Sequence, residues 1–230
     1  LSHRSCLYAE MNLVMRAKGG KSGRQSAKRL PHLLALTDPD RAPDPHAALA
    51  HLPRGAGLVW RTYQTKPSRA ALVSLAHAAR RKHVALFVAV AERKNPRPAN
   101  VGEHLPEFRL KAPCTEKKYA RGRREPRGTP VTAAAHSAPA VIAAARAGVD
   151  AVLISPVFAT ASHASIRPLG VTRFAALATL AHSLELGVYA LGGVTDKAQM
   201  RRLGGSKPTG YAGIGIFKRL SSMRNPPGYS

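Results

Sequence analysis

The sequence is poor in cysteine, in long apolar runs and in acidic residues, and each shortage excludes a class of protein. Its two cysteines, Cys6 and Cys114, lie far apart and match no metal-ligand spacing, so they form no disulfide framework and suit a reducing compartment. The longest apolar stretches, such as residues 84–91 and 138–145, are much shorter than the roughly 20 residues that span a bilayer. We therefore expect a cytoplasmic protein without a transmembrane helix.

The shortage of acids leaves a strongly basic chain. Lys and Arg number 36 against 12 Asp and Glu, which gives a net charge of +24. Much of the excess lies in residues 1–29 and 109–127. Such a charge can attract nucleic acid or steer anionic substrates, and it can equally be a solvated basic surface. Because no RNA- or DNA-binding motif accompanies it, we do not expect nucleic acid to be a partner.

Length and composition favour a single folded domain. The 230 residues suit one α/β barrel, a fold that commonly takes about 200 to 250 residues. We expect a disordered basic extension over residues 1–29, which lack the apolar core of a secretory signal. A (β/α)8 TIM barrel then occupies residues 30–222 and a tail residues 223–230. A homo-oligomer is compatible with this organisation.

From Leu30 onward, short β-rich runs alternate with Ala-rich segments of helical period, as in a parallel α/β fold. Continuous apolar runs such as LFVAV and AVLISPVF are typical of parallel strands that are covered on both faces. Eight strands suit a closed barrel. We predict them at 32–37, 57–63, 84–90, 101–105, 130–135, 151–158, 188–192 and 211–217.

The clearest helices are predicted at 67–81, 138–147 and 171–186. Ser137 is a suitable N-cap for the second, with Pro139 in its first turn and Gly148 just after its end. A fourth helix belongs in residues 109–127, but prolines and a glycine interrupt that stretch and its charge is almost entirely positive. We expect it to be irregular.

Candidate catalytic groups follow the strands of the second half, because barrel enzymes use the carboxyl ends of their strands. Strand five runs into His136 and Ser137, which places an imidazole where it can act as a general acid or base. A purely structural histidine is the alternative. Strand six runs into SPVFATASH, whose Thr160, Ser162 and His163 suit a phosphate or pyrophosphate cradle, although such loops are also ordinary turns.

Glycines follow the last two strands. Gly192 and Gly193 come after strand seven, and strand eight carries Gly213, Ile214 and Gly215. In many barrels these two loops bind phosphate through backbone N–H groups, which glycine lets an anion approach closely. We favour a phosphate site, although glycines at strand ends are also plain turn formers.

Taken in order, HS, SPVFATASH, LGGVT and the glycine-bearing eighth strand resemble the thiamine phosphate synthase and TenI family. Looser agreement through LLALTDPDR, GAGLVWRTY and EHLPE extends the resemblance over about residues 32–217. The resemblance implies a TIM barrel with a role in thiamine biosynthesis. The reaction that we expect from the resemblance is that of the synthase branch, a transferase reaction that couples hydroxymethylpyrimidine pyrophosphate to thiazole phosphate and releases pyrophosphate.

The resemblance also implies roles for individual residues. Gly193 and the backbone of residues 213–216 would hold the thiazole phosphate, and the loop after strand six would face the pyrophosphate or thiazole end. Arg61 would contact the pyrimidine pyrophosphate. The expected partners are therefore small phosphorylated thiazole and pyrimidine substrates.

The sequence departs from the synthases at their metal site. Synthases carry an Asp after strand three and another acid after strand four, which hold the Mg²⁺ that neutralises the departing pyrophosphate. Here neither place has an Asp, and Glu92, Glu103 or Glu107 could substitute. His163 also stands where the usual loop has a lysine.

Two alternatives therefore stay open. The TenI branch shares the barrel and the HS motif and tautomerises a thiazole phosphate without a metal. In that branch His136 would shuttle the proton. A non-catalytic barrel that binds thiazole phosphate without turnover is the other alternative.

Overall fold

The computed structural model describes residues 30–62, 67–89, 98, 100–110, 129–160 and 167–214. The predicted extension over residues 1–29, the predicted tail over 223–230 and most of the irregular stretch at 109–127 lie outside these residues. The eight strands and the helices between the strands lie within the described residues.

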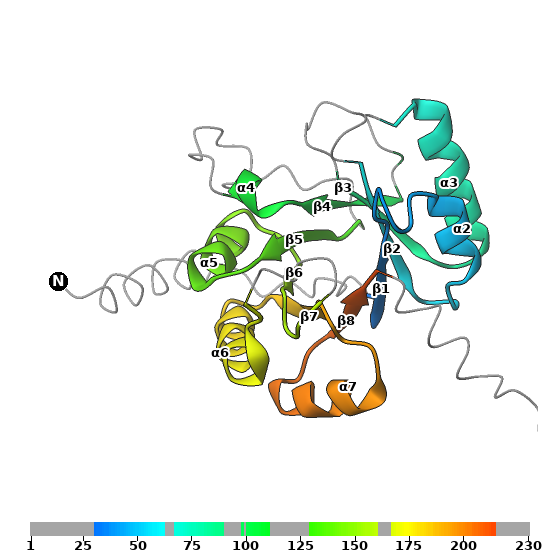
Figure 1. Cartoon of the computed structure of the whole chain (residues 1–230). Helices are drawn as coiled ribbons and strands as arrows, with labels where there is room; N and C mark the ends of the chain where they lie inside the picture. Colours follow the sequence, from blue (N-terminus) through cyan, green and yellow to red (C-terminus); the bar gives the residue numbers. More distant parts are fainter. Residues whose placement is uncertain are drawn as a thin grey trace, which may run out of the picture.

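Eight parallel strands close into a barrel in chain order, with β8 hydrogen-bonded to β1 (Figure 1). The predicted TIM barrel is thereby confirmed. The strands are β1 Leu33–Leu36, β2 Gly57–Arg61, β3 Ala85–Ala89, β4 Val101–Leu105, β5 Val131–Ala135, β6 Ala151–Ile154, β7 Gly187–Leu191 and β8 Gly210–Gly213.

Helices cover the outside of this ring (Figure 1). All three of the helices predicted as clearest are present, and Ser137 caps α5 as expected, since its Oγ accepts from the backbone N of Ala140 at 3.4 Å. The helices are α2 Pro45–Ala50, α3 Arg69–Arg81, α4 Glu107–Leu110, α5 Ala138–Arg146, α6 Gly170–Ser183 and α7 Lys197–Leu203, followed by the short 3-10 helix η2 Gly204–Ser206.

Strand six ends four residues earlier than predicted. Beyond Ile154 the chain leaves the ladder, and the backbone N–H groups of Val157 and Phe158 donate to Leu191 and Gly192 at 3.0 Å each. Pro156, Val157 and Phe158 therefore belong to a loop that packs against the loop after β7, not to a strand. The predicted end of strand eight, at residues 215–217, lies outside the described residues.

The interior of the barrel is filled by side chains from alternate strand positions. Val59, Phe87, Leu153 and Tyr189 are all 0% exposed. The Tyr189 hydroxyl donates to the Pro31 carbonyl at 2.6 Å, at the amino end of the strands, and burial raises the pKa of this phenol. The interior is therefore a packed core, and the hydrogen-bonded Tyr189 closes it at the amino ends of the strands.

One buried histidine interrupts this apolar core. A Cβ on Gly102 would lie 2.7 Å from the Phe87 ring, so Gly102 faces the interior, and by strand alternation His104 also faces inward. His104 Nδ1 lies 2.9 Å from Thr132 Oγ1, which itself donates to the Glu103 carbonyl at 3.4 Å. Burial, with the positive charge of Arg61 adding to it, lowers the pKa of His104 from 6.5 to about 3. The imidazole is therefore neutral at physiological pH.

We expect His104 to make the fold sensitive to acid. The pKa of His104 is lower in the folded state than in the unfolded state. Below pH 6.5 the unfolded chain therefore takes up a proton at His104 that the folded chain does not bind. The resulting loss of stability continues until pH reaches about 3. The slope from this group is at most about 1.4 kcal/mol per pH unit. In urea unfolding between pH 7 and 4.5, His104→Gln should lose stability less steeply than the wild type, and the exposed His46→Gln should follow the wild type. Parallel curves for all three proteins would contradict the assignment.

Two glycines test the importance of backbone conformation. Gly148 follows α5 with φ +70°, whereas Gly204 follows α7 with φ −56°, and a Cβ would meet nothing within 4 Å at either place. Gly148→Ala should lower the free energy of unfolding by about 1 kcal/mol, because an L-residue is strained in the left-handed region. Gly204→Ala should not lower it, because its helical φ suits alanine. Chemical denaturation of both variants compares the two, and equal losses would show that φ is not the cause.

Candidate active site at the carboxyl ends of the strands

The carboxyl ends of all eight strands meet at one rim, because every neighbouring pair is parallel. The predicted site residues that the structure describes all lie at this rim, and their binding and catalytic roles stay predictions. Arg61 ends β2, His136 and Ser137 follow β5, Thr160 lies in the loop after β6, Gly192 and Gly193 follow β7, Gly213 ends β8 and Ile214 follows it. Ser162, His163 and Gly215 lie outside the described residues.

His136 is held in one orientation. Its Nδ1 lies 2.7 Å from the Ser155 carbonyl oxygen and 3.2 Å from the Ser155 hydroxyl. A carbonyl oxygen only accepts hydrogen bonds, so Nδ1 carries the proton and Nε2 of the neutral ring is an acceptor. The His136 side chain is 50% exposed. The arrangement therefore presents a basic nitrogen at the rim of the barrel.

Glu107, at the start of α4, is the neighbour of this histidine. Its Oε2 accepts the backbone N–H of His136 at 2.8 Å and lies 3.8 Å from His136 Nε2. A carboxylate at this distance stabilises the imidazolium that forms when His136 takes up a proton. The sequence analysis considered Glu107 only as a metal ligand, and the contact with His136 was missed, since it joins residues 29 apart.

The glycines after β7 have a structural reason of their own. Gly193 has φ +69°, and a Cβ there would lie 2.6 Å from the Ala159 carbonyl oxygen. The loops after β6 and β7 are thus in close contact and are joined by the backbone bonds from Val157 and Phe158. Glycine is required for this approach, whatever anion the loops bind.

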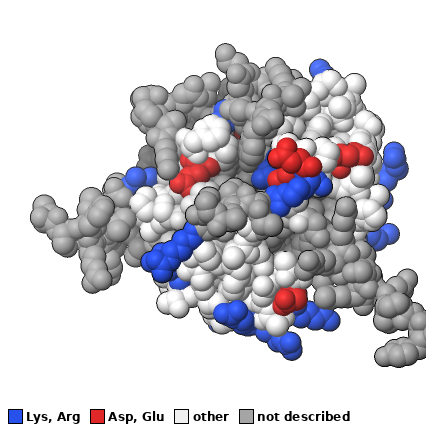
Figure 2. Space-filling view, viewed as in Figure 1, with Lys and Arg blue, Asp and Glu red and all other residues white. Residues whose placement is uncertain are grey.

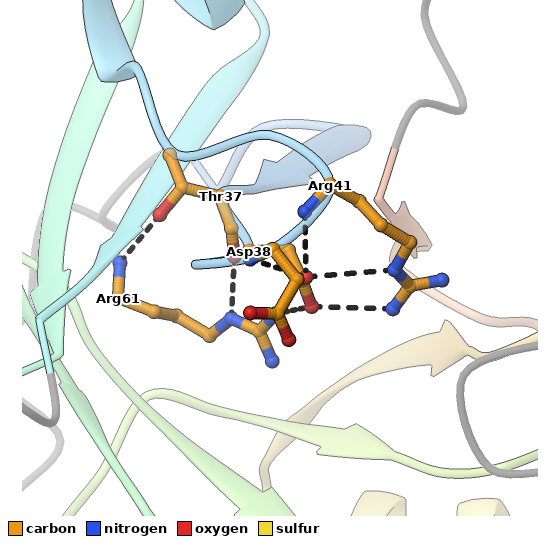
Figure 3. Close-up of polar contacts among 5 residues, drawn as sticks. Thr37, Asp38, Arg41 and Arg61 are labelled. Atoms are coloured by element: carbon orange, nitrogen blue, oxygen red, sulfur yellow. Dashed lines mark hydrogen bonds and ion pairs between the residues drawn. The ribbon is translucent and has the colours of Figure 1, made fainter.

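Arg61 lies on the other side of the rim and points inward, as Val59 does two residues before it. Its Nε donates to the Thr37 carbonyl at 2.5 Å, and its Nη2 donates to Asp38 Oδ2 at 2.7 Å (Figure 3). Burial alone would raise the pKa of Asp38, but hydrogen bonds from Arg41 and the charges of Arg41 and Arg61 outweigh it and lower the pKa below 3.8. Asp38 was present in the TDPDR motif, but nothing in that motif identifies Arg61 as its partner.

The acids proposed as metal ligands lie apart from one another, and one of them lies outside the described residues. No group of three or more His, Cys, Asp or Glu side chains gathers within the described residues as a metal would require. Glu103 faces away from the barrel interior by strand alternation, Glu107 lies beside His136, and Glu92 lies outside the described residues. The magnesium prediction is therefore untested.

Basic side chains lie in separate groups over the described part of the face in Figure 2, and acidic side chains accompany some of them. They do not form one continuous stripe on that face. Among the described helices, none combines the length and the apolar character that crossing a membrane requires.

Solved structures share the fold. The HpcH/HpaI aldolase from Desulfitobacterium hafniense DCB-2 superposes with a TM-score of 0.56 at 13% identity, covering 87% of this chain and 95% of its own. A putative deoxyribose-phosphate aldolase from Coccidioides immitis gives 0.55 at 12% identity, over 95% and 98%. The tetrameric deoxyribose phosphate aldolase from Aeropyrum pernix gives 0.52 at 15% identity, over 98% and 99%. At these identities the likeness concerns the barrel alone.

No curated protein sequence matches the chain significantly. A family model does match it, over residues 104–214, which run from β4 past the end of β8 and include His136 and the glycines of the last two strands. The resemblance inferred from the sequence motifs is therefore confirmed over this part of the barrel, which matches the model of the family described as thiamine monophosphate synthase, TMP-TENI.

Proposed function

We propose that the protein is an enzyme of thiamine biosynthesis that binds a thiazole phosphate at the carboxyl rim of its barrel and tautomerises it with His136. The observation that carries the proposal is the fixed tautomer of His136. Nδ1–H is bound to the Ser155 carbonyl at 2.7 Å, so the half-exposed ring offers Nε2 as a base.

The proposed reaction needs only this base and its neighbours. Nε2 takes a proton from one position of the thiazole phosphate and returns it at another, so no electron or group leaves the ligand. While the proton is on His136, the Glu107 carboxylate, 3.8 Å from Nε2, stabilises the positive charge. The Ser155 carbonyl prevents the ring from turning.

The phosphate would lie near the glycines of β7 and β8, as the family resemblance implies. Strands β5 to β8 are consecutive neighbours in the closed barrel, so His136 and these glycines occupy one arc of the rim. The same arc falls within the segment that matches the family model. A single small ligand could therefore span the base and the phosphate loops.

The synthase reaction is the second candidate. Arg61 and its neighbour Arg41 supply positive charge for a pyrophosphate on the β1–β2 side. Tautomerisation is preferred because the orientation of His136 supplies its base directly. If Mg²⁺ is used, Glu92 and Glu107 are the remaining candidate ligands and the metal would neutralise the leaving pyrophosphate.

His136→Gln should reduce tautomerisation of the thiazole phosphate by about 100-fold or more, since a general base contributes at least that factor. The rate is measured by following the thiazole tautomers with purified protein. His182→Gln, an exposed histidine near the end of α6, is the matched control and should keep the wild-type rate. Equal rates in wild type and His136→Gln would remove His136 from this role.

Supplying both phosphorylated precursors with and without Mg²⁺ separates the two candidate reactions. We expect tautomerisation that is independent of Mg²⁺ and no thiamine phosphate. Formation of thiamine phosphate would instead establish the synthase reaction. Binding of the thiazole phosphate without either product would indicate a non-catalytic barrel.

A further inference from the structure

A group of basic residues lies at the amino ends of β2 and β3, the end of the barrel that faces away from the candidate active site. Arg54 comes shortly before β2, and α3 ends in Arg80 and Arg81 shortly before β3. All three residues are exposed. Because β2 and β3 are neighbouring parallel strands, the three belong to one surface of the barrel. We call Arg54, Arg80 and Arg81 the amino-end arginines.

Hydrogen bonds join the segments that carry the amino-end arginines. The backbone N–H of Gly55 donates to the His83 carbonyl at 2.8 Å, which links the turn before β2 to the end of α3. The Lys82 ammonium donates to the Leu49 carbonyl at 2.9 Å and also to the Ala50 carbonyl, which links the end of α3 to the end of α2. Figure 1 shows α2 and α3 side by side on the outside of the barrel. The amino-end arginines therefore project from one hydrogen-bonded unit.

The surface around the amino-end arginines is poor in acidic residues. Within the described part of this region, residues 45–62 and 67–89 contain no Asp or Glu. Asp150 and Glu185 also lie at the amino end of the barrel, but they precede β6 and β7, which stand opposite β2 and β3 in the ring. The described acids of this end are therefore on the other side of the barrel.

Two acids lie on neighbouring elements, and neither pairs with the amino-end arginines. Asp44 caps the start of α2, at the opposite end of the barrel, where its carboxylate accepts the backbone N–H of His46 at 2.8 Å. Glu103 lies on β4 and is only 4% exposed. None of the amino-end arginines forms a hydrogen bond or ion pair with another described residue. Their charges are therefore available to an anion from outside.

The directions of these side chains exclude a single small anion as the ligand of the whole group. Arg80 and Arg81 are consecutive in a helix, so their side chains leave it about 100° apart. Such side chains suit an extended anion that carries several charges. Among the described residues the exposed large hydrophobic side chain is Phe108, which lies on α4 at the other end of the barrel. The surface therefore offers neither an apolar anchor for a membrane nor an aromatic platform for nucleic-acid bases.

We propose that the amino-end arginines form a docking surface for an acidic segment of a partner protein. Each guanidinium can donate two parallel hydrogen bonds to one carboxylate, so a run of Asp and Glu side chains can pair with all three. Nucleic acid suits the surface less well, because proteins that bind it strongly contact about six to ten phosphates. A second copy of this chain would place the same positive surface against itself and would be repelled.

Docking at this end leaves the carboxyl rim of the barrel free. The proposal is therefore independent of the proposed tautomerisation, and a partner could remain bound while a ligand enters and leaves the candidate active site.

A fluorescently labelled deca-glutamate peptide is the probe, and its binding is measured by fluorescence anisotropy at low salt. The variant Arg54→Gln/Arg80→Gln/Arg81→Gln should bind the peptide about tenfold more weakly than the wild type, the combined loss of three exposed ion pairs. Raising the salt concentration should weaken binding by the wild type, because salt screens exposed charges. A deca-glutamine peptide should not bind.

The matched control removes the same charge from the other side of the barrel. Arg167, Arg173 and Arg201 are exposed and lie on or beside α6 and α7. The variant Arg167→Gln/Arg173→Gln/Arg201→Gln should bind deca-glutamate as the wild type does. Equal losses in the two triple variants would show that the net charge of +24 attracts the peptide without a defined surface, and would overturn the proposal.

Thermal unfolding verifies that both triple variants are folded. A wild-type protein that does not bind deca-glutamate would also overturn the proposal. Single-stranded RNA and vesicles of anionic lipid are tested in the same way. If either bound more tightly than deca-glutamate and lost its binding in the Arg54→Gln/Arg80→Gln/Arg81→Gln variant, the assignment to an acidic protein segment would be wrong.

Discussion

The hydrogen bonds between β8 and β1 are the constraint on which the other features depend. They close eight parallel strands into a ring, so every strand must deliver its carboxyl end to the same rim. Closure also fixes which residue of each strand points inward. Residues more than a hundred positions apart, such as Arg61 and Gly213, thereby share one end of one barrel.

Closure forces polar groups into a crowded interior, and small residues make room for them. Arg61 of β2 pairs in register with Ala89 of β3. Val88 pairs with Glu103, so the next residues along, Ala89 and His104, are also neighbours. Ala89 therefore lies between the inward-facing Arg61 and His104. Because the side chain of Ala89 is only a methyl group, it does not shield the imidazole of His104 from the charge of Arg61. His104 consequently stays neutral, since an imidazolium there would be both buried and repelled by Arg61.

The sequence predicted those features that depend on local pattern. Strands such as β3 and β6 were found because fully covered strands are continuous apolar runs. Ser137 was identified as a cap because capping depends on neighbouring residues. Contacts between distant segments were not predictable. The pairing of Asp38 with Arg61 joins residues 23 apart, and the contact of Glu107 with His136 joins residues 29 apart, so no local pattern in the chain indicates either of them.

The bonding between the loops after β6 and β7 has a mechanical consequence. Backbone hydrogen bonds from Val157 and Phe158 tie the two loops together, and Gly193 lets them touch. Ser155, which orients His136, is in the first loop, and the candidate phosphate-binding glycines begin the second. The orientation of His136 and the position of these glycines therefore depend on the same hydrogen bonds between the two loops.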